Sequence, residues 1–323
     1  MTGKDLRIIF MGTPDFAVAS LKALVEKHYQ VVGVITSPDK PAGRGRQLRA
    51  SAVKEYAVSQ GIPVMQPVRL RDDCFLDELR ALKADLQIVV AFRMLPEVVW
   101  DMPRMGTFNL HASLLPQYRG AAPLNWAIIN GEQETGVTSF LLSHEIDTGA
   151  VLFQHKVPIG KDDTLEVIHD RLMMVGAGLV LKTTDKLAEG DYRLIDQSEL
   201  IKSETLKPAP KLFKDDGRID WTQPAEKIRN LIRGLSPYPA AWTEIVDGKG
   251  KTASLKIYFA SIEPFEQPSF PGTIFSDGKS FLKIAAADAW LSLIDLQLSG
   301  KKRMPVAGLL RGFHGIDQLR IKQ

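Results

Sequence analysis

The sequence of 323 residues contains a single cysteine, Cys74, so no disulfide can form within the chain. This usage fits a reducing cytoplasm, which is where we expect the protein to work. No apolar run approaches the roughly 18 residues of a membrane span, and the first residues, MTGKDLRIIFMG, lack the pattern of a signal peptide. We therefore expect neither membrane insertion nor secretion.

A glycine-rich dinucleotide fingerprint is also missing. The apolar run Arg7–Met11 is followed by Gly12 alone, where a G-x-G-x-x-G motif would carry three glycines. This counts against a dinucleotide-dependent dehydrogenase. Helical spacing over Phe16–Lys27 and an apolar run at Val31–Thr36 nevertheless complete a strand–helix–strand opening, which favours an α/β fold with a mostly parallel sheet.

The charge of the chain is small but uneven. The net charge is +3, yet residues 208–323 hold 17 Lys and Arg against 12 Asp and Glu, whereas residues 1–207 hold 24 against 26. A basic C-terminal part on a slightly acidic N-terminal part points weakly to a polyanionic partner. With 45% hydrophobic residues, the chain is long enough for two domains, each with its own core.

Beyond residue 50, expected helices and strands alternate, and after about residue 240 short strands predominate. We expect helices at Ala50–Gln60, Asp73–Lys83, Pro123–Asn130 and Thr164–Leu187, and strands at Ile62–Gln66, Leu86–Phe92, Gly136–Leu142 and Val151–Val157. Beyond a helix near Ala225–Gly234, short strands are expected around Ala241–Val246, Ser254–Ile262, Gly272–Phe275, Phe281–Ala285 and Trp290–Leu298. Short strands at this spacing favour a small β-barrel. The expected organisation is an α/β domain over residues 1–195, a polar linker over 196–210 and a barrel domain over 211–323.

Polar chemistry is concentrated at the end of one expected strand, within Met105–Gly120. Asn109 and His111 alternate there with Phe108 and Leu110. Residues two apart in a strand point to the same face, so the amide and the imidazole should project together. In open α/β sheets, ligands bind beyond the carboxyl ends of the strands. The segment is therefore a candidate reaction centre, although an Asn-x-His tripeptide by itself is more often structural.

A second polar cluster, His144–Gly149, follows the expected strand Gly136–Leu142. Asp147 in this cluster could meet His111 in one crevice if the two strand ends converge. The triplet Asp147-Thr148-Gly149 resembles an aspartic-protease motif, but it occurs once and lies in a βαβ context, which does not fit that chemistry.

A basic stretch, Ser37–Arg49, is punctuated by proline and glycine and is expected to have no regular structure. Its cations are Lys40, Arg44, Arg46 and Arg49. Guanidinium groups suit phosphate geometry, and a long loop without structure of its own is often functional. Contact with nucleic acid and a merely solvated surface loop both remain open from these residues.

Six motifs in order cover nearly the whole chain: FMGTPDFA, PDKPAGRGRQL, FNLHASLLPQYRGAAP, GVTSFLLSHEIDTGAVL, APKL…DGRIDW and IRGLSPYPAAWT. Together they resemble the methionyl-tRNA formyltransferase family. The resemblance implies a Rossmann-like formyltransferase domain followed by an OB-like barrel. It also implies transfer of formyl from 10-formyltetrahydrofolate to the α-amine of methionine on initiator tRNA, with no metal and no obligate protein partner.

The resemblance also implies roles for particular residues. Asn109, His111 and Asp147 would form the catalytic trio, with Asp147 holding His111. The folate site would be lined by Ser113, Leu114, Leu115 and Pro116 and flanked by Phe92, Arg93, Met94 and Leu95 and by residues 141–147. The acceptor end of tRNA would meet Arg44 and its neighbours Lys40, Arg46 and Arg49. The sequence departs from the usual pattern at Arg93, where a small residue is common, at Ala112 in place of a frequent glycine, and at Ser143-His144-Glu145.

Two other functions compete with this interpretation. The same formyl donor could serve a small amine, such as glycinamide ribonucleotide or an amino sugar nucleotide, but such an acceptor needs neither the basic loop nor the barrel. The chain could instead be a catalytically silent RNA-binding module. The intact set Asn109, His111 and Asp147 argues against that alternative.

Overall fold

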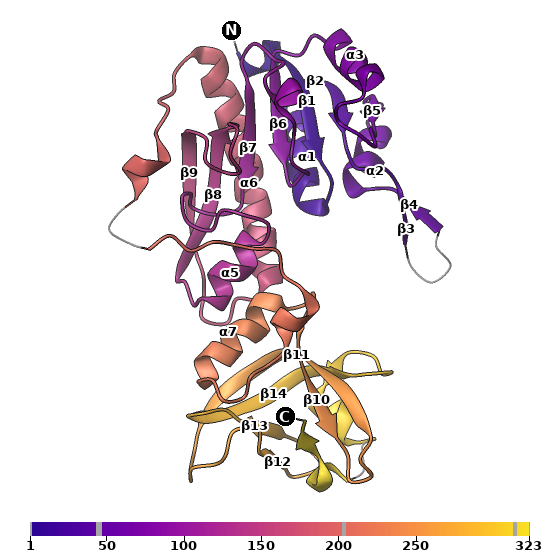
Figure 1. Cartoon of the computed structure of the whole chain (residues 1–323), viewed down its shortest axis with the longest axis vertical. Coiled ribbons are helices and arrows are strands. Elements are labelled where there is room, and N and C mark those ends of the chain that lie inside the picture. Colours follow the sequence, from indigo (N-terminus) through magenta and orange to yellow (C-terminus); the bar gives the residue numbers. More distant parts are fainter. Residues whose placement is uncertain (1, 43–46, 202–204, 313–314, 323) are drawn as a thin grey trace. The chain divides into compact units, whose positions relative to one another are not determined.

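The computed structural model describes residues 2–42, 47–201, 205–312 and 315–322, which form two compact units (Figure 1). The first unit comprises residues 1–123, 135–158 and 169–208, and the second comprises 124–134, 159–168 and 209–323. None of the described helices is long and apolar enough to cross a membrane.

A seven-stranded sheet forms the centre of the first unit, in the order β5-β2-β1-β6-β7-β8-β9. Its strands are β1 (Arg7–Gly12), β2 (Gln30–Ile35), β5 (Val64–Met65), β6 (Leu86–Val90), β7 (Thr107–His111), β8 (Glu134–Leu141) and β9 (Val151–Pro158). The pairs from β5 through β7 are parallel, and β8 pairs with β7 in the antiparallel sense. The expected α/β fold with a mostly parallel sheet is confirmed.

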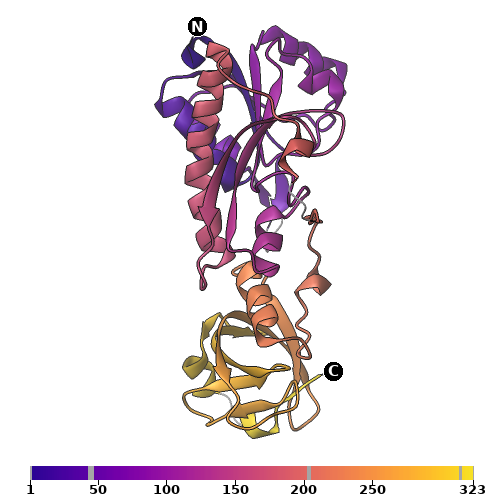
Figure 2. The same cartoon turned by 90° about the vertical axis from the view of Figure 1, so that its left-hand side faces the viewer.

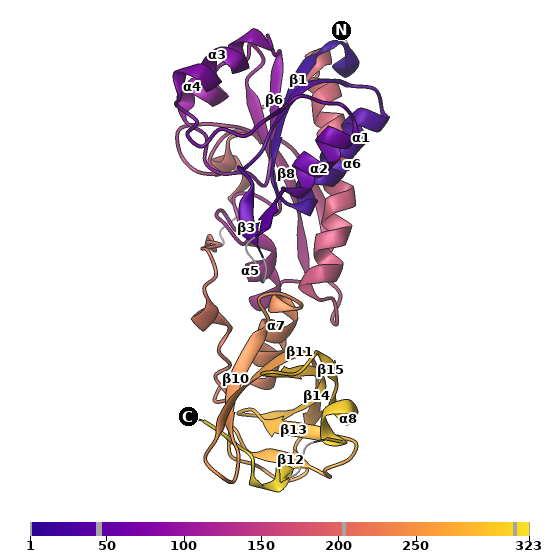
Figure 3. The same cartoon turned by 90° about the vertical axis from the view of Figure 1, so that its right-hand side faces the viewer.

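Helices cover both faces of this sheet. They are α1 (Asp15–Glu26), α2 (Ala52–Ser59), α3 (Asp73–Ala81), α4 (Glu97–Trp100) and α6 (Leu165–Glu189). The helix α5 (Pro123–Ile129) belongs almost entirely to the second unit. Figures 2 and 3 show α3 and α4 on one face and α1, α2 and α6 on the other. All five residues of β6 are buried between these layers, as its continuous apolar sequence predicts. The helix α2 starts where the Ser51 side chain accepts a hydrogen bond from the Lys54 N–H.

The basic stretch 37–49 is not devoid of structure, and that expectation was wrong. Two short strands, β3 (Lys40–Ala42) and β4 (Gln47–Arg49), pair in the antiparallel sense as a hairpin. Its base is tied down by Asp39, whose carboxylate binds Lys54 Nζ at 2.6 Å and Gln66 Nε2 at 2.8 Å. Strands of three residues, one of which contains proline, carry too little periodicity to be predicted from sequence.

The second unit is an antiparallel barrel preceded by α7 (Ala225–Leu235). Its strands are β10 (Ala241–Val246), β11 (Thr252–Pro264), β12 (Ile274–Ser276), β13 (Leu282–Ala285), β14 (Ala289–Leu298), β15 (Met304–Pro305) and β16 (Arg320–Ile321), with the short helix α8 (Val306–Leu310). The order is β12-β13-β14-β11-β10-β16, and β15 pairs with β14. The expected small barrel domain is confirmed.

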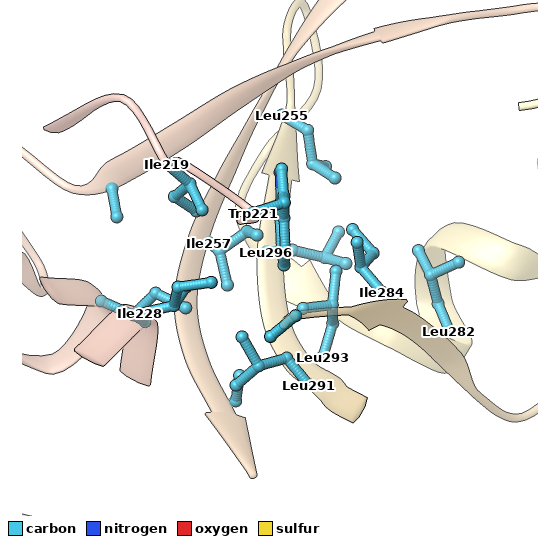
Figure 4. Close-up of a cluster of buried hydrophobic side chains, with 14 of the residues drawn as sticks. Ile219, Trp221, Ile228, Leu255, Ile257, Leu282, Ile284, Leu291, Leu293 and Leu296 are labelled. Atoms are coloured by element: carbon cyan, nitrogen blue, oxygen red, sulfur yellow. The ribbon is translucent and has the colours of Figure 1, made fainter. Parts of the chain in front are cut away.

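The core of the barrel is aliphatic, with one tryptophan at its centre. Figure 4 shows Trp221 among side chains of β11, β13 and β14, including Ile257, Ile284 and Leu296. Trp221 is 5% exposed, and its indole N–H donates to Thr243 Oγ1 at 3.2 Å. This bond satisfies the one polar atom that the ring brings into the core.

Short 3₁₀ helices occur at Gly3–Asp5 (η1), Gln197–Leu200 (η2), Lys214–Gly217 (η3) and Ile316–Gln318 (η4). The helix η2 falls in the segment 196–210 that we expected to be a linker. Gln197 in it is only 2% exposed, and residues up to 208 belong by contact to the first unit. The described part of this segment up to residue 208 therefore packs on the α/β unit. The proposed domain boundaries stay a prediction.

Candidate active site

The strand β7 presents Asn109 and His111 at the carboxyl edge of the parallel strands. Its neighbours on the other face, Phe108 and Leu110, are 0% and 3% exposed and pack into the core. In the sheet, Asn109 lies opposite Val89 of β6, and β7 ends at His111. The alternation in the sequence therefore places both polar side chains as expected.

His111 is buried and makes one hydrogen bond through its ring. Its Nε2 lies 2.9 Å from the Tyr118 carbonyl oxygen. A carbonyl oxygen can only accept, so Nε2 carries the proton of this bond. The other ring nitrogen, Nδ1, lies 3.8 Å from Asp147 Oδ2. The imidazole thus uses Nε2 for anchoring and turns Nδ1 toward the carboxylate.

Asp147 reaches His111 from the turn that follows β8. Its backbone has φ of 56°, in the left-handed region, which costs a non-glycine residue about 1–2 kcal/mol. Its Oδ2 accepts a hydrogen bond from the Gly120 N–H at 3.0 Å. Two residues on, a Cβ at Gly149 would collide with the Leu141 carbonyl oxygen, so the close return of this turn requires glycine. The predicted convergence of Asp147 and His111 is confirmed by their positions.

The turn Tyr118–Gly120 links the two side chains. Tyr118 supplies the carbonyl that holds His111, and Gly120 supplies the N–H that holds Asp147. The Tyr118 N–H in turn donates to the Lys207 carbonyl oxygen at 2.8 Å. The imidazole and the carboxylate are therefore both fixed to one three-residue turn.

Asn109 has an amide oxygen without a protein partner. Its Oδ1 is buried and accepts no hydrogen bond from any described residue. A buried polar atom left unpaired costs about 1–3 kcal/mol, so such atoms in native structures usually indicate a bound ligand, a water or a catalytic role. The unpaired amide oxygen lies two residues from His111 on the same face of β7, which makes this edge a candidate ligand site.

Comparison with known proteins gives this site a context. The formyl transferase family matches residues 6–184, and the formyl transferase C-terminal domain matches residues 211–314. The chain is 59% identical to a methionyl-tRNA formyltransferase of Parabacteroides distasonis, over 99% of this chain and 100% of that protein. It is 55% identical to that of Bacteroides fragilis, over 100% and 99%.

The chain belongs to the methionyl-tRNA formyltransferase family.

Solved formyltransferase structures share the fold of this family member. An N-formyltransferase from Helicobacter canadensis, in complex with folinic acid and dTDP-3-aminofucose, aligns with a TM-score of 0.65 and 20% identity, over 89% of this chain and 98% of that one. HypX from Aquifex aeolicus, in complex with tetrahydrofolic acid, aligns with a TM-score of 0.62 and 20% identity, over 94% of this chain and 47% of that one.

The segment expected to line the folate site is tightly held by β8 and β9. Ser113, Leu115 and Pro116 are buried, and the Ser113 hydroxyl donates to the Gln117 carbonyl oxygen at 2.6 Å. Thr138 Oγ1 donates to the Ser113 carbonyl oxygen and accepts the Leu115 N–H. Leu114 packs over Gly136 of β8. These side chains fix the shape of the segment.

Two loops beside the site expose apolar side chains. Met94, in the loop after β6, is 70% exposed, and Ile146, next to Asp147, is 59% exposed. Phe92 and Leu95 instead pack into the core of the α/β unit. His144, in the 141–147 loop, contacts Trp100 of α4 edge-on, with ring centroids 5.5 Å apart.

Arg93, one of the positions where the sequence departs from the family pattern, connects two segments of the α/β unit through hydrogen bonds. Its guanidinium donates to the carbonyl oxygens of Pro67 and Val68, which follow β5. Burial lowers the pKa of the guanidinium from its usual value. Arg93 therefore ties the loop after β6 to a neighbouring segment through its side chain.

The expected tRNA-binding cations are only partly described. Lys40 and Arg49 are exposed and lie directly opposite each other at the base of the β3–β4 hairpin. Arg44 and Arg46 fall outside the residues that the structure describes. Like charges placed directly opposite are destabilising in an isolated hairpin, so this pair suits an anionic partner.

Sequence reasoning missed the residues that support the trio. The sequence motifs assign no role to Tyr118, Arg119 or Gln197. Tyr118 is hydrogen-bonded to His111 and Gln197 to Asp147, and Arg119 is hydrogen-bonded to Gln197. The basic turn Tyr118–Gly120 next to a strand end was the available signal for the first two. Nothing local in the sequence marks Gln197.

Proposed function

We propose that the protein transfers the formyl group of 10-formyltetrahydrofolate to the free α-amino group of methionine on initiator tRNA. The observation that carries the proposal is the meeting of Asn109, His111 and Asp147 at the carboxyl edge of β7, in a chain 59% identical to a methionyl-tRNA formyltransferase. Because charged tRNA is used in the cytoplasm, we propose that the enzyme works there.

The reaction needs stabilisation of an oxyanion and movement of a proton. The amine attacks the formyl carbon, a C–N bond forms, and the carbonyl oxygen becomes an oxyanion. The bond from this carbon to N10 of the folate then breaks, and N10 takes up a proton while the amine loses one. Covalent attachment to the protein is not needed for this exchange.

Asn109 and His111 suit the oxyanion. A carboxamide N–H from Asn109 would donate to it, and the oxygen of the same amide is buried and unpaired among the described residues. Protonated His111 would donate through Nδ1, because Nε2 is used by the Tyr118 carbonyl. Each donor of this kind is worth roughly 3–4 kcal/mol in the transition state.

Asp147 suits the proton transfer. Among the described residues, the Asp147 carboxylate accepts a hydrogen bond from the Gly120 N–H and from no cationic side chain, and its Oδ2 lies 3.8 Å from His111 Nδ1. A carboxylate in this position can take the proton of the attacking amine, directly or through a water, and His111 can relay a proton toward N10. Proton transfer by a positioned group contributes about 10²–10⁴-fold.

Met94 and Ile146 suit the flat ring system of the donor. Exposed apolar side chains on two loops beside a reaction centre favour burial of an aromatic ligand. The segment Ser113–Pro116 would contribute shape and backbone groups, since the Ser113 hydroxyl is already bonded within the segment.

The identity of the formyl acceptor distinguishes this proposal from its main alternative, formyl transfer to a small amine. Initial rates of formyl transfer from 10-formyltetrahydrofolate should be compared for methionyl initiator tRNA, uncharged tRNA with free methionine, glycinamide ribonucleotide and a dTDP-amino sugar. We expect turnover with the charged tRNA and at most trace turnover with the others. A higher kcat/KM for either small amine would contradict the proposal, and no transfer to any acceptor would support the silent RNA-binding module.

A further inference from the structure

The side chain of Gln197 connects both halves of the proposed centre. It is 2% exposed, although it lies in the polar segment after α6. Its Nε2 donates to the carbonyl oxygens of Asp147 at 2.8 Å and Gly149 at 2.9 Å. Its Oε1 accepts from Arg119 Nε at 3.0 Å and Nη2 at 2.6 Å. One side-chain amide can make four such bonds, and Gln197 makes all four.

These four bonds determine the orientation of the amide. If the oxygen and nitrogen of Gln197 exchanged places, the NH₂ would face a guanidinium that can only donate, and the oxygen would face two carbonyls that can only accept. The backbone near Gln197 is also fixed, because Ile195 and Val151 exchange two hydrogen bonds at the start of β9. The position of Gln197 is therefore fixed by backbone hydrogen bonds between Ile195 and Val151, which do not involve the proposed catalytic residues.

Through Nε2, Gln197 acts on Asp147. The left-handed conformation of Asp147 and the close return at Gly149 both place carbonyl oxygens toward η2, and Gln197 bonds both. Without these bonds the turn would lose the contacts that hold its unfavourable backbone, and the carboxylate would no longer be fixed beside His111.

Through Oε1, Gln197 holds Arg119 and with it the Tyr118–Gly120 turn. Arg119 is the middle residue of the turn whose ends bond His111 and Asp147. Holding the Arg119 guanidinium from the same amide that holds the Asp147 backbone sets the distance between the turn and the carboxylate.

We propose that Gln197 is a positioning residue for formyl transfer, which holds Asp147 and the Tyr118–Gly120 turn in register around the reacting carbon. It touches neither substrate in this proposal and acts through other residues. The inference rests on the proposed catalytic roles of His111 and Asp147.

The test is steady-state kinetics with 10-formyltetrahydrofolate and methionyl initiator tRNA. Gln197→Leu removes all four hydrogen bonds and keeps a side chain of similar size. Gln197→Glu keeps a partner for Arg119 but sets a carboxylate oxygen against the carbonyls of Asp147 and Gly149. We expect both variants to lose about 10²-fold in kcat, as expected for a misplacement near 1 Å, with both KM values within threefold of wild type.

Tyr29→Phe is the matched control for a purely structural loss. It removes a partly buried hydrogen bond to Asp185 at 2.8 Å, next to the amino end of β2 and so at the opposite edge of the sheet. All variants should be checked by thermal unfolding. The control should keep wild-type kcat even if its unfolding temperature falls as much as that of the Gln197 variants.

The decisive readout is coupling to Asp147. In an Asp147→Asn background, Gln197→Leu should lower kcat by no more than twofold, because His111 and Asp147 act as one unit and Asp147→Asn already disables that unit. A full 10²-fold further loss in that background would overturn the proposal, as would a wild-type kcat for Gln197→Leu alone while Asp147→Asn is slow. If Asp147→Asn itself turns over at the wild-type rate, the proposed role of Asp147 falls, and this inference falls with it.

Discussion

At the scale of single residues, the site combines well-anchored groups with one unanchored group. His111 and Asp147 are held by backbone atoms of one turn, whereas Asn109 presents a buried amide oxygen that no described residue satisfies. An unpaired buried atom of this kind lowers the stability of the free protein, and it is retained because it acts when substrate binds.

Asn109→Ala should therefore separate activity from stability. We predict a fall in kcat of about 10²–10³-fold, because one oxyanion donor is lost. The free energy of unfolding should stay the same or rise slightly, because the substitution removes a buried amide oxygen that has no partner among the described residues. Chemical denaturation and steady-state assays on the same preparation measure both. A large loss of stability with intact kcat would assign Asn109 to the fold instead.

At the scale of elements, the β3–β4 hairpin is the candidate arm for tRNA. Replacing Lys40 and Arg49 together by alanine should raise KM for methionyl initiator tRNA and leave KM for 10-formyltetrahydrofolate unchanged. The slope of log kcat/KM against log salt concentration should become shallower by about 1–2, since each lost phosphate contact removes roughly 0.7–0.9. An unchanged slope would remove these two residues from the tRNA interface.

The anchoring of this hairpin should depend on pH. A hydrogen bond from Lys54, with a second from Gln66, holds the pKa of the Asp39 carboxyl below its usual value of 3.8. A depressed folded pKa stabilises the protein at pH values above 3.8, and this contribution disappears as the pH falls through the folded pKa. Asp39→Asn should thus lower the urea midpoint at pH 7, and the difference from wild type should shrink steadily as the pH falls below 3.8. A difference that stays constant across this pH range would contradict this origin.

Elements differ in how far the sequence predicts them. The strand β7 and its two polar residues follow from a period of two, and β6 follows from an unbroken apolar run. The β3–β4 hairpin could not be predicted because its strands are three residues long. Gln197 could not be predicted because its four bonds join segments about 50 and 80 residues away, and no local pattern records such contacts.

At the scale of the whole molecule, the candidate active site and the barrel lie in separate units. Every contact among Asn109, His111, Asp147, Tyr118–Gly120 and Gln197 lies within the α/β unit. The barrel has its own core around Trp221 and carries the basic excess of the sequence. Substitutions in the trio should accordingly change kcat far more than KM for tRNA.

The most direct measurement is the single-turnover rate of formyl transfer to methionyl initiator tRNA at saturating 10-formyltetrahydrofolate, for wild type, His111→Ala, Asp147→Asn and the double variant. We predict that each single variant is at least 10²-fold slower. The double variant should be scarcely slower than the worse single variant, because the two groups act as one unit. A rate near wild type for either single variant, with normal folding, would contradict the proposed centre.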